Sequence, residues 1–194
     1  MFVKRHWAVT LAALTCLAAC SSLPPSPRDL LDEHTGVTVT VVGAPIDFAR
    51  VSYEAANSTT HDYLRLVAVR IDNAGKYSEL FVLYRWSAAF SGMPAPPDES
   101  SAQLIIEIDE HELELQPLER LPPGLPRAKE LFAPETADAV MRAYATNLET
   151  MELIARSRQL TARLPPQESP SAPFSLWRDG RPALAQLAKQ LSGP

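Results

Sequence analysis

Two long apolar segments separated by a turn constrain the fold of this chain more than any other feature. Residues 62–72 are rich in valine, leucine and isoleucine, and residues 76–87 place apolar or aromatic side chains on both faces. Asn73-Ala74-Gly75 between them is a turn signal typical of a hairpin. Because a strand that is apolar on both faces needs cover on both sides, we expect this hairpin to lie centrally in a β-sandwich.

Shorter segments with alternating apolar residues predict further strands. These are residues 36–42, 46–53, 102–109, 112–116, 137–146, 159–164 and 174–178. Thr146 and Glu149 have capping-box spacing before a helical apolar pattern, and Pro182 suits the first turn of a second helix. The predicted fold is mainly β: an antiparallel β-sandwich (Ig-like) with one or two short peripheral helices, forming a single domain over residues 28–194.

The first residues have the pattern of a secretory signal peptide. Residues 1–7 carry Lys4 and Arg5, and residues 8–19 form a mostly apolar run. This run is too short for a membrane-spanning helix, which needs about 20 apolar residues. A short positive segment followed by a short apolar core is the pattern of a cleaved leader.

The leader ends in Leu17-Ala18-Ala19-Cys20, which resembles the lipobox of bacterial lipoproteins. The resemblance implies that signal peptidase recognises Leu17, Ala18 and Ala19 and cuts before Cys20. It also implies diacylglycerol on the Cys20 sulfur and a fatty acyl chain such as palmitate on its amine. Cys16 would leave with the leader, so Cys20 would be the one cysteine retained. The alternative is an ordinary secretory leader with an incidental cysteine.

The residues after Cys20 predict a stalk and a location. Residues 20–27 combine the lipidated cysteine with a Pro/Ser-rich segment that spaces a domain from a bilayer. In the lipoprotein family, serine directly after the cysteine permits export, so Ser21 and Ser22 are the sorting residues. The expected location is the periplasmic face of the outer membrane, with the inner membrane as the alternative.

Composition favours a globular domain that does not bind nucleic acid. The hydrophobic fraction of 46% is typical of a packed domain rather than a disordered chain. The formal net charge is −5, and losing Lys4 and Arg5 with the leader makes the remainder more negative. An acidic chain without a basic patch repels nucleic acid, so we expect no nucleic-acid partner.

Motifs for catalysis or metal binding are weak. Asp109-Glu110-His111-Glu112 could bind a divalent metal, but a solvated acidic turn is the favoured interpretation. His34, His61 and His111 are the histidines beyond the leader, and neither Ser78 nor Ser91 lies in a G-x-S-x-G motif. We therefore predict no catalytic residue, no metal and no cofactor.

Four aromatic residues raise the question of a binding face. Tyr77, Tyr84, Trp86 and Trp177 could line a surface for a sugar or a peptide. Tyr84 and Trp86 share the apolar face of one strand, so core packing is favoured for both. The pattern leaves the side on which Trp177 lies undecided.

The order of elements resembles that of uncharacterised envelope lipoproteins of Gram-negative bacteria. The shared pattern is the hairpin of residues 63–86, the later acidic hairpin, and Phe174 to Gly180 followed by a helix. This resemblance implies no activity. The preferred function is a non-enzymatic, lipid-anchored binding or accessory module with an envelope protein as partner. The alternatives are a periplasmic hydrolase acting on an envelope component and a carrier of a small apolar ligand.

Overall fold

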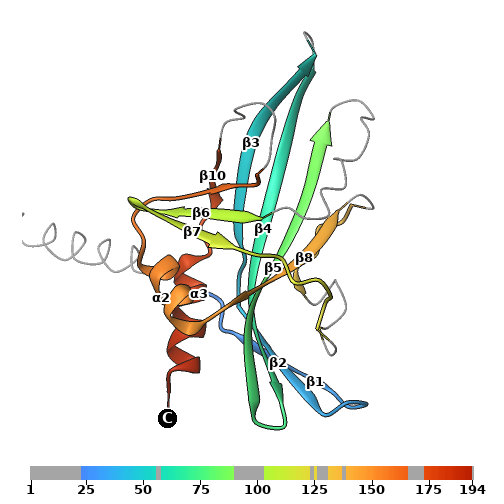
Figure 1. The fold of residues 1–194 in the computed structure, drawn as a ribbon, viewed down its shortest axis with the longest axis vertical. Coiled ribbons are helices and arrows are strands. Elements are labelled where there is room, and N and C mark those ends of the chain that lie inside the picture. Colours follow the sequence, from blue (N-terminus) through green and yellow to red (C-terminus); the bar gives the residue numbers. More distant parts are fainter. Residues whose placement is uncertain are drawn as a thin grey trace, which may run out of the picture.

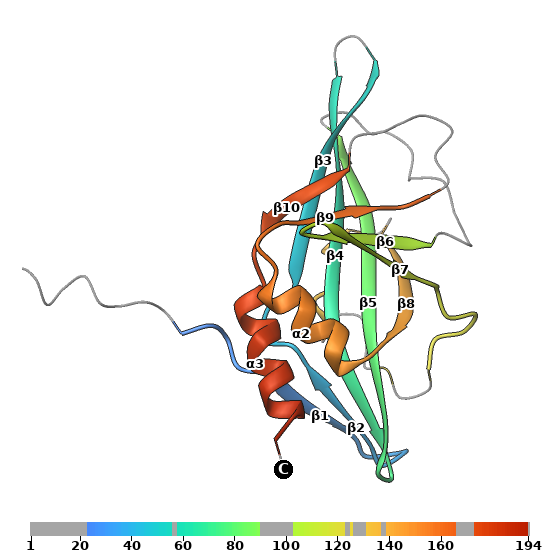
Figure 2. The same ribbon diagram turned by 60° about the vertical axis from the view of Figure 1, so that its left-hand side comes forward.

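Within the residues that the structure describes, the chain folds into a mainly antiparallel β structure with two short helices, as the computed structural model shows in Figures 1 and 2. The predicted sandwich-like fold class is thereby confirmed. The structure describes residues 23–55, 58–89, 103–122, 125, 131–136, 139–165 and 173–193. Its ten strands are hydrogen-bonded into a single sheet.

The centre of the sheet is the hairpin of β4 (Ser58–Asn73) and β5 (Lys76–Ala89). The two strands pair continuously from Thr60 opposite Ala89 to Asn73 opposite Lys76. Ala74 and Gly75 both have positive φ, and the Gly75 N–H donates to the Asp72 carboxylate, which closes a tight turn. These strands run along the long axis of the molecule (Figure 1).

The other edge of β4 is shared by two strands. β2 (Val37–Val41) pairs with its last residues, and β3 (Ile46–Ala55) pairs with its first half. Between them the Val42 N–H still donates to the Ala68 carbonyl, so residues 37–55 follow β4 with one break. β1 (Arg28–Asp32) pairs with the outer side of β2.

Four further strands extend the sheet beyond β3. They follow in the order β10 (Phe174–Arg178), β9 (Leu160–Arg163), β6 (Leu104–Ile108) and β7 (His111–Leu115). β6 and β7 lie across the direction of β3, β4 and β5 (Figure 2). β8 (Val140–Thr146) covers the free side of β5, and Pro117, just after β7, forms a bridge to Tyr144 of β8.

The helices α2 (Leu148–Arg156) and α3 (Arg181–Leu191) lie beside each other against the sheet (Figure 1). Each turns an apolar stripe inward: Met151 and Ile154 from α2, and Leu184 and Leu187 from α3, are buried. Arg70 of β4 donates to the Leu191 carbonyl at the end of α3, where a cation favours the helix dipole.

Most predicted elements are confirmed, with two corrections. The cap of α2 is Asn147, whose side chain accepts from the Thr150 N–H, so the predicted capping box at Thr146 is wrong by one residue. β1 was not predicted, because its sequence Arg-Asp-Leu-Leu-Asp lacks the alternation that marks a strand. α3 begins with Pro182 in its first turn, as expected.

The segment that precedes β1 packs against the domain. A Cβ on Gly43 would lie 1.9 Å from the Pro25 carbonyl oxygen, so only glycine permits this close approach. Leu17, Ala18, Ala19, Cys20, Ser21 and Ser22 lie outside the described residues, and their predicted roles stay predictions. Among the described residues, no helix has the length and apolar character needed to cross a bilayer.

Candidate binding face

Four rings from three strands lie together on one face of the sheet, and we call them the aromatic row. Its members are His61 and Tyr63 of β4, Trp86 of β5 and Trp177 of β10. The Tyr63 and Trp86 rings stack with centroids 5.2 Å apart, and Trp177 lies 5.1 Å from Tyr63 on the other side. His61 stacks 6.2 Å from Tyr63. The row therefore crosses the sheet from β5 to β10.

Strand register explains how these rings meet. Tyr63 lies directly opposite Trp86 on β5 and opposite Ala49 on β3. Directly opposed side chains share a face of the sheet, so Tyr63 and Trp86 stack. Ala49 is small, which lets Trp177 reach across β3 to contact Tyr63.

The row is only partly covered. Trp177 is 51% exposed, and Trp86 is half-buried where it packs against the edge of the core. Tyr63 and His61 are also half-buried. An aromatic surface of this kind offers apolar area together with indole N–H and phenol O–H groups, which is the chemistry that binding faces use.

The structure separates the four aromatic residues that the sequence grouped. Tyr84 is buried, and burial raises its pKa to about 12, so its predicted core packing is confirmed. Tyr77 is 58% exposed at the far end of the β4–β5 hairpin, where Arg70 lies over its ring. Only Trp86 and Trp177 belong to the row, and each contacts Tyr63. Tyr63 was missed, because a single tyrosine in an apolar strand gives no signal until its neighbours are known.

A buried ion pair lies beside the row on the same face of the sheet. Arg65 donates from Nε and Nη2 to the two oxygens of Asp47, at 2.7 and 2.9 Å, and the Asp47 side chain is fully buried. Its remaining donor Nη1 reaches the Phe132 carbonyl at 2.9 Å. The guanidinium also lies 5.3 Å from the centre of the Trp86 ring. Arg65 thus joins the row, the sheet and the segment of residues 131–136.

A second ion pair lies on the opposite face of the same strands. Arg50 donates to Asp62, whose other oxygen accepts from the Ser87 hydroxyl at 2.6 Å. The Arg50 guanidinium rests on the Phe174 ring, 4.2 Å from its centre. The carboxylates of both pairs are therefore engaged in contacts that hold the sheet together.

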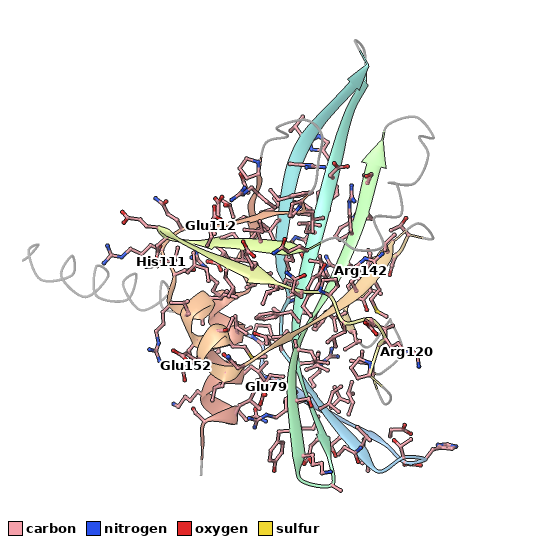
Figure 3. The ribbon with its side chains drawn as sticks, in the orientation of Figure 1. Glu79, His111, Glu112, Arg120, Arg142 and Glu152 are labelled. Atoms are coloured by element: carbon pink, nitrogen blue, oxygen red, sulfur yellow. The ribbon has the colours of Figure 1, made fainter. Side chains whose placement is uncertain are left out.

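The acidic turn of residues 109–112 has a structural role as well. Asp109 accepts hydrogen bonds from the Arg158 and Gln159 N–H groups, and the Gln159 bond is the main cause that lowers the pKa of its carboxyl. His111 and Glu112 lie at the outer end of the β6–β7 hairpin (Figure 3), and Glu112 forms an ion pair with Arg163. Within the described ranges, no three His, Cys, Asp or Glu side chains lie close enough to hold a metal ion.

The histidines do not gather at one place. His34 is an exposed turn residue 3.9 Å from Asp32, His61 belongs to the row, and His111 is exposed on its hairpin. Ser78 is exposed on β5, and Ser91 lies outside the described residues.

The chain was compared with protein-family models, with curated proteins and with solved structures, and none of the three comparisons gives a match.

Replacing Arg65 with methionine should destabilise the fold strongly. The change leaves the buried Asp47 carboxylate without its partner, which costs about 3–5 kcal/mol of unfolding free energy. Urea denaturation followed by circular dichroism measures this loss. Arg163→Met is the matched control, because it removes an arginine from partly exposed pairs worth under about 1 kcal/mol. A double variant Asp47→Asn/Arg65→Met should recover part of the loss. Equal losses for Arg65→Met and Arg163→Met would contradict this account.

Acid stability should depend on Asp109 and Asp179. Hydrogen bonds lower both pKa values, that of Asp179 chiefly through the Arg181 side chain. A lowered folded-state pKa adds stability above the unfolded value of about 3.9, and this stability disappears as pH falls through the folded value. The variant Asp109→Asn/Asp179→Asn should therefore have a lower Tm at pH 7 and a shallower fall in Tm between pH 5 and pH 2. Glu110→Gln, in the same turn as Asp109, should follow the wild-type curve.

Proposed function

We propose that this protein is a non-enzymatic lipoprotein that is anchored through Cys20 at the periplasmic face of the outer membrane. It binds another component of the envelope through the aromatic row. The observation that carries the proposal is the half-exposed Trp177, whose ring lies tilted against Tyr63, which in turn stacks on Trp86. Partly exposed tryptophan and tyrosine are the residues most enriched where binding energy concentrates.

The charged groups support a binding role rather than a catalytic one. A catalytic acid or base needs an ionisable group that faces a substrate and is free to exchange a proton. Asp47 and Asp62 are the buried carboxylates of the described core, and each is held by an arginine. Their contacts fix β3 to β4 on both faces of the sheet, beside the row and behind it, so they hold a rigid surface in place.

The anchor would hold this surface at the membrane. Two or more acyl chains give firm membrane attachment, since each buried CH₂ contributes about 0.8 kcal/mol. The chain from Cys20 to Leu23 is short, and Pro25 and Ser26 lie against Gly43 at the break between β2 and β3. The domain is thus expected to sit close to the bilayer rather than on a long free stalk.

Cys20→Ser should abolish lipid attachment and leave the leader uncut, because serine has no sulfur to accept diacylglycerol. Immunoblotting of separated membranes should show the wild-type protein in the outer-membrane fraction and an unprocessed Cys20→Ser form. Cys16→Ser is the matched control and should be processed normally. A normally processed, membrane-bound Cys20→Ser protein would refute the anchor, and wild-type protein mainly in the inner membrane would refute the sorting role of Ser21 and Ser22.

A photo-crosslinking amino acid at position 177 tests the binding role. In living cells we expect a discrete crosslinked product from position 177 and none from position 77, because Tyr77 is at least as exposed but lies at the turn end of the β4–β5 hairpin, away from the row. Tyr63→Ala should weaken the product by removing the ring that supports Trp177. Mass spectrometry of the purified product identifies the component. Equal background labelling at both positions would count against the proposed function.

A further inference from the structure

The aromatic row ends at β10 in a corner formed by Trp177 and Arg178. Strand pairing is irregular at this corner, and the irregularity shapes a candidate binding site. Ser175 and Leu176 pair in register with Ala49 and Phe48 of β3, but the next residue of β3, Asp47, lies opposite Arg178 rather than Trp177. This β-bulge inserts Trp177 as an extra residue. Bulges re-aim side chains and are frequent beside functional sites.

The bulge places two consecutive side chains on one face. In a regular strand Arg178 would alternate to the opposite side from Trp177. Here Arg178 occupies the position opposite Asp47, on the face that carries Tyr63, and its guanidinium lies 4.8 Å from the centre of the Trp177 ring. An exposed indole and an exposed guanidinium are thereby brought together.

The charge of this corner is positive. Asp47, the nearest carboxylate in register, is already bound at both oxygens by Arg65. Within the part of the chain that the structure describes, Arg178 forms no ion pair; its contact is with the Trp177 ring. The site is therefore a cation next to an aromatic surface on a protein whose net charge is −5.

From this geometry we propose that the Trp177–Arg178 corner binds a saccharide chain that carries carboxylates, an inference that rests on the proposed function of the row. The apolar C–H face of a sugar ring packs on the indole, and the guanidinium binds the carboxylate in a charge-assisted pair. Tyr63 and Trp86, which stack on each other and are half-buried, continue the surface at ring spacings of 5.1 and 5.2 Å, so neighbouring sugars along the chain meet the exposed parts of further rings.

The pairing of β3 and β4 argues against an extended peptide as a ligand in the middle of the row. Such a peptide binds by adding a strand to an unpaired edge. β3 lies between β10 and β4, and β4 lies between β3 and β5, so both are paired on both sides where the row crosses them, whereas β9 pairs with β10 only at Phe174 and Ser175. The middle of the row therefore offers side chains rather than backbone groups, which suits a ligand recognised through aromatic contacts and a carboxylate.

Fluorescence titration of the full-length lipoprotein in detergent tests the inference. The probes are a peptide-free oligosaccharide of alternating N-acetylglucosamine and N-acetylmuramic acid, a hexuronic acid oligomer, and a neutral N-acetylglucosamine oligomer, all of equal length. An acidic oligomer should bind about tenfold more tightly than the neutral one, with an advantage that shrinks as salt rises. The acidic oligomer that binds more tightly identifies the source of the carboxylate, cell-wall glycan or uronate-containing polysaccharide.

Three variants distinguish the contribution of the Arg178 charge to binding from that of the Trp177 ring. Arg178→Gln should remove the preference for the acidic oligomer and leave neutral binding unchanged. Trp177→Ala should abolish binding of all three oligomers, and Tyr77→Ala should match the wild type. Binding of none of the three, or an equal loss of acidic and neutral binding in Arg178→Gln, would overturn the inference. If no saccharide binds but the crosslink at position 177 persists, the proposed function of the row stands and the saccharide inference is wrong. If neither saccharide binding nor the crosslink is observed, both proposals are wrong.

Discussion

The continuous pairing of β4 with β5 is the interaction on which the rest of the molecule depends. β4 is long enough to hold both β2 and β3 on one edge while β5 covers the other along its length. β5 in turn holds β8. The register of each of these neighbouring strands depends on the central hairpin. The tight turn at Ala74 and Gly75 fixes the register of β4 against β5. If β5 slipped by one residue against β4, Trp86 would move to the opposite face from Tyr63, and Ser87 would move away from Asp62.

The alternation of β3 and β4 also distributes their charges. Asp47 and Arg65 meet on one face, whereas Arg50 and Asp62 meet on the other. Burying a charge is costly unless it is paired and hydrogen-bonded, and both carboxylates satisfy this condition. The Asp47–Arg65 pair consequently helps to position the aromatic row, because Arg65 contacts the Trp86 ring and Asp47 lies opposite Arg178.

Much of the fold could be predicted because its signals are local. The alternating valines of residues 37–41, the turn after Asn73 and the proline at the start of α3 each specify their own element through backbone preference and side-chain period. The elements that escaped prediction lack such signals. β1 is polar and irregular in pattern, and its strand conformation comes from pairing with β2. The one-residue error at Asn147 arose because threonine and asparagine are both good caps, and the surrounding chain selects between them.

The candidate site was harder to predict from the sequence, because it is formed by the register between neighbouring strands and not by any one segment. The sequence determined by itself that aromatic residues occur in β5 and β10, and it singled out Trp86 and Trp177. The tertiary structure alone decided that Tyr63 joins them, because only strand pairing places Tyr63 opposite Trp86. It also decided that Trp177 and Arg178 share a face, because a bulge is defined by the partner strand β3. Local sequence fixes the conformation of a segment, whereas neighbours across a sheet are fixed by hydrogen bonds between segments far apart in the chain.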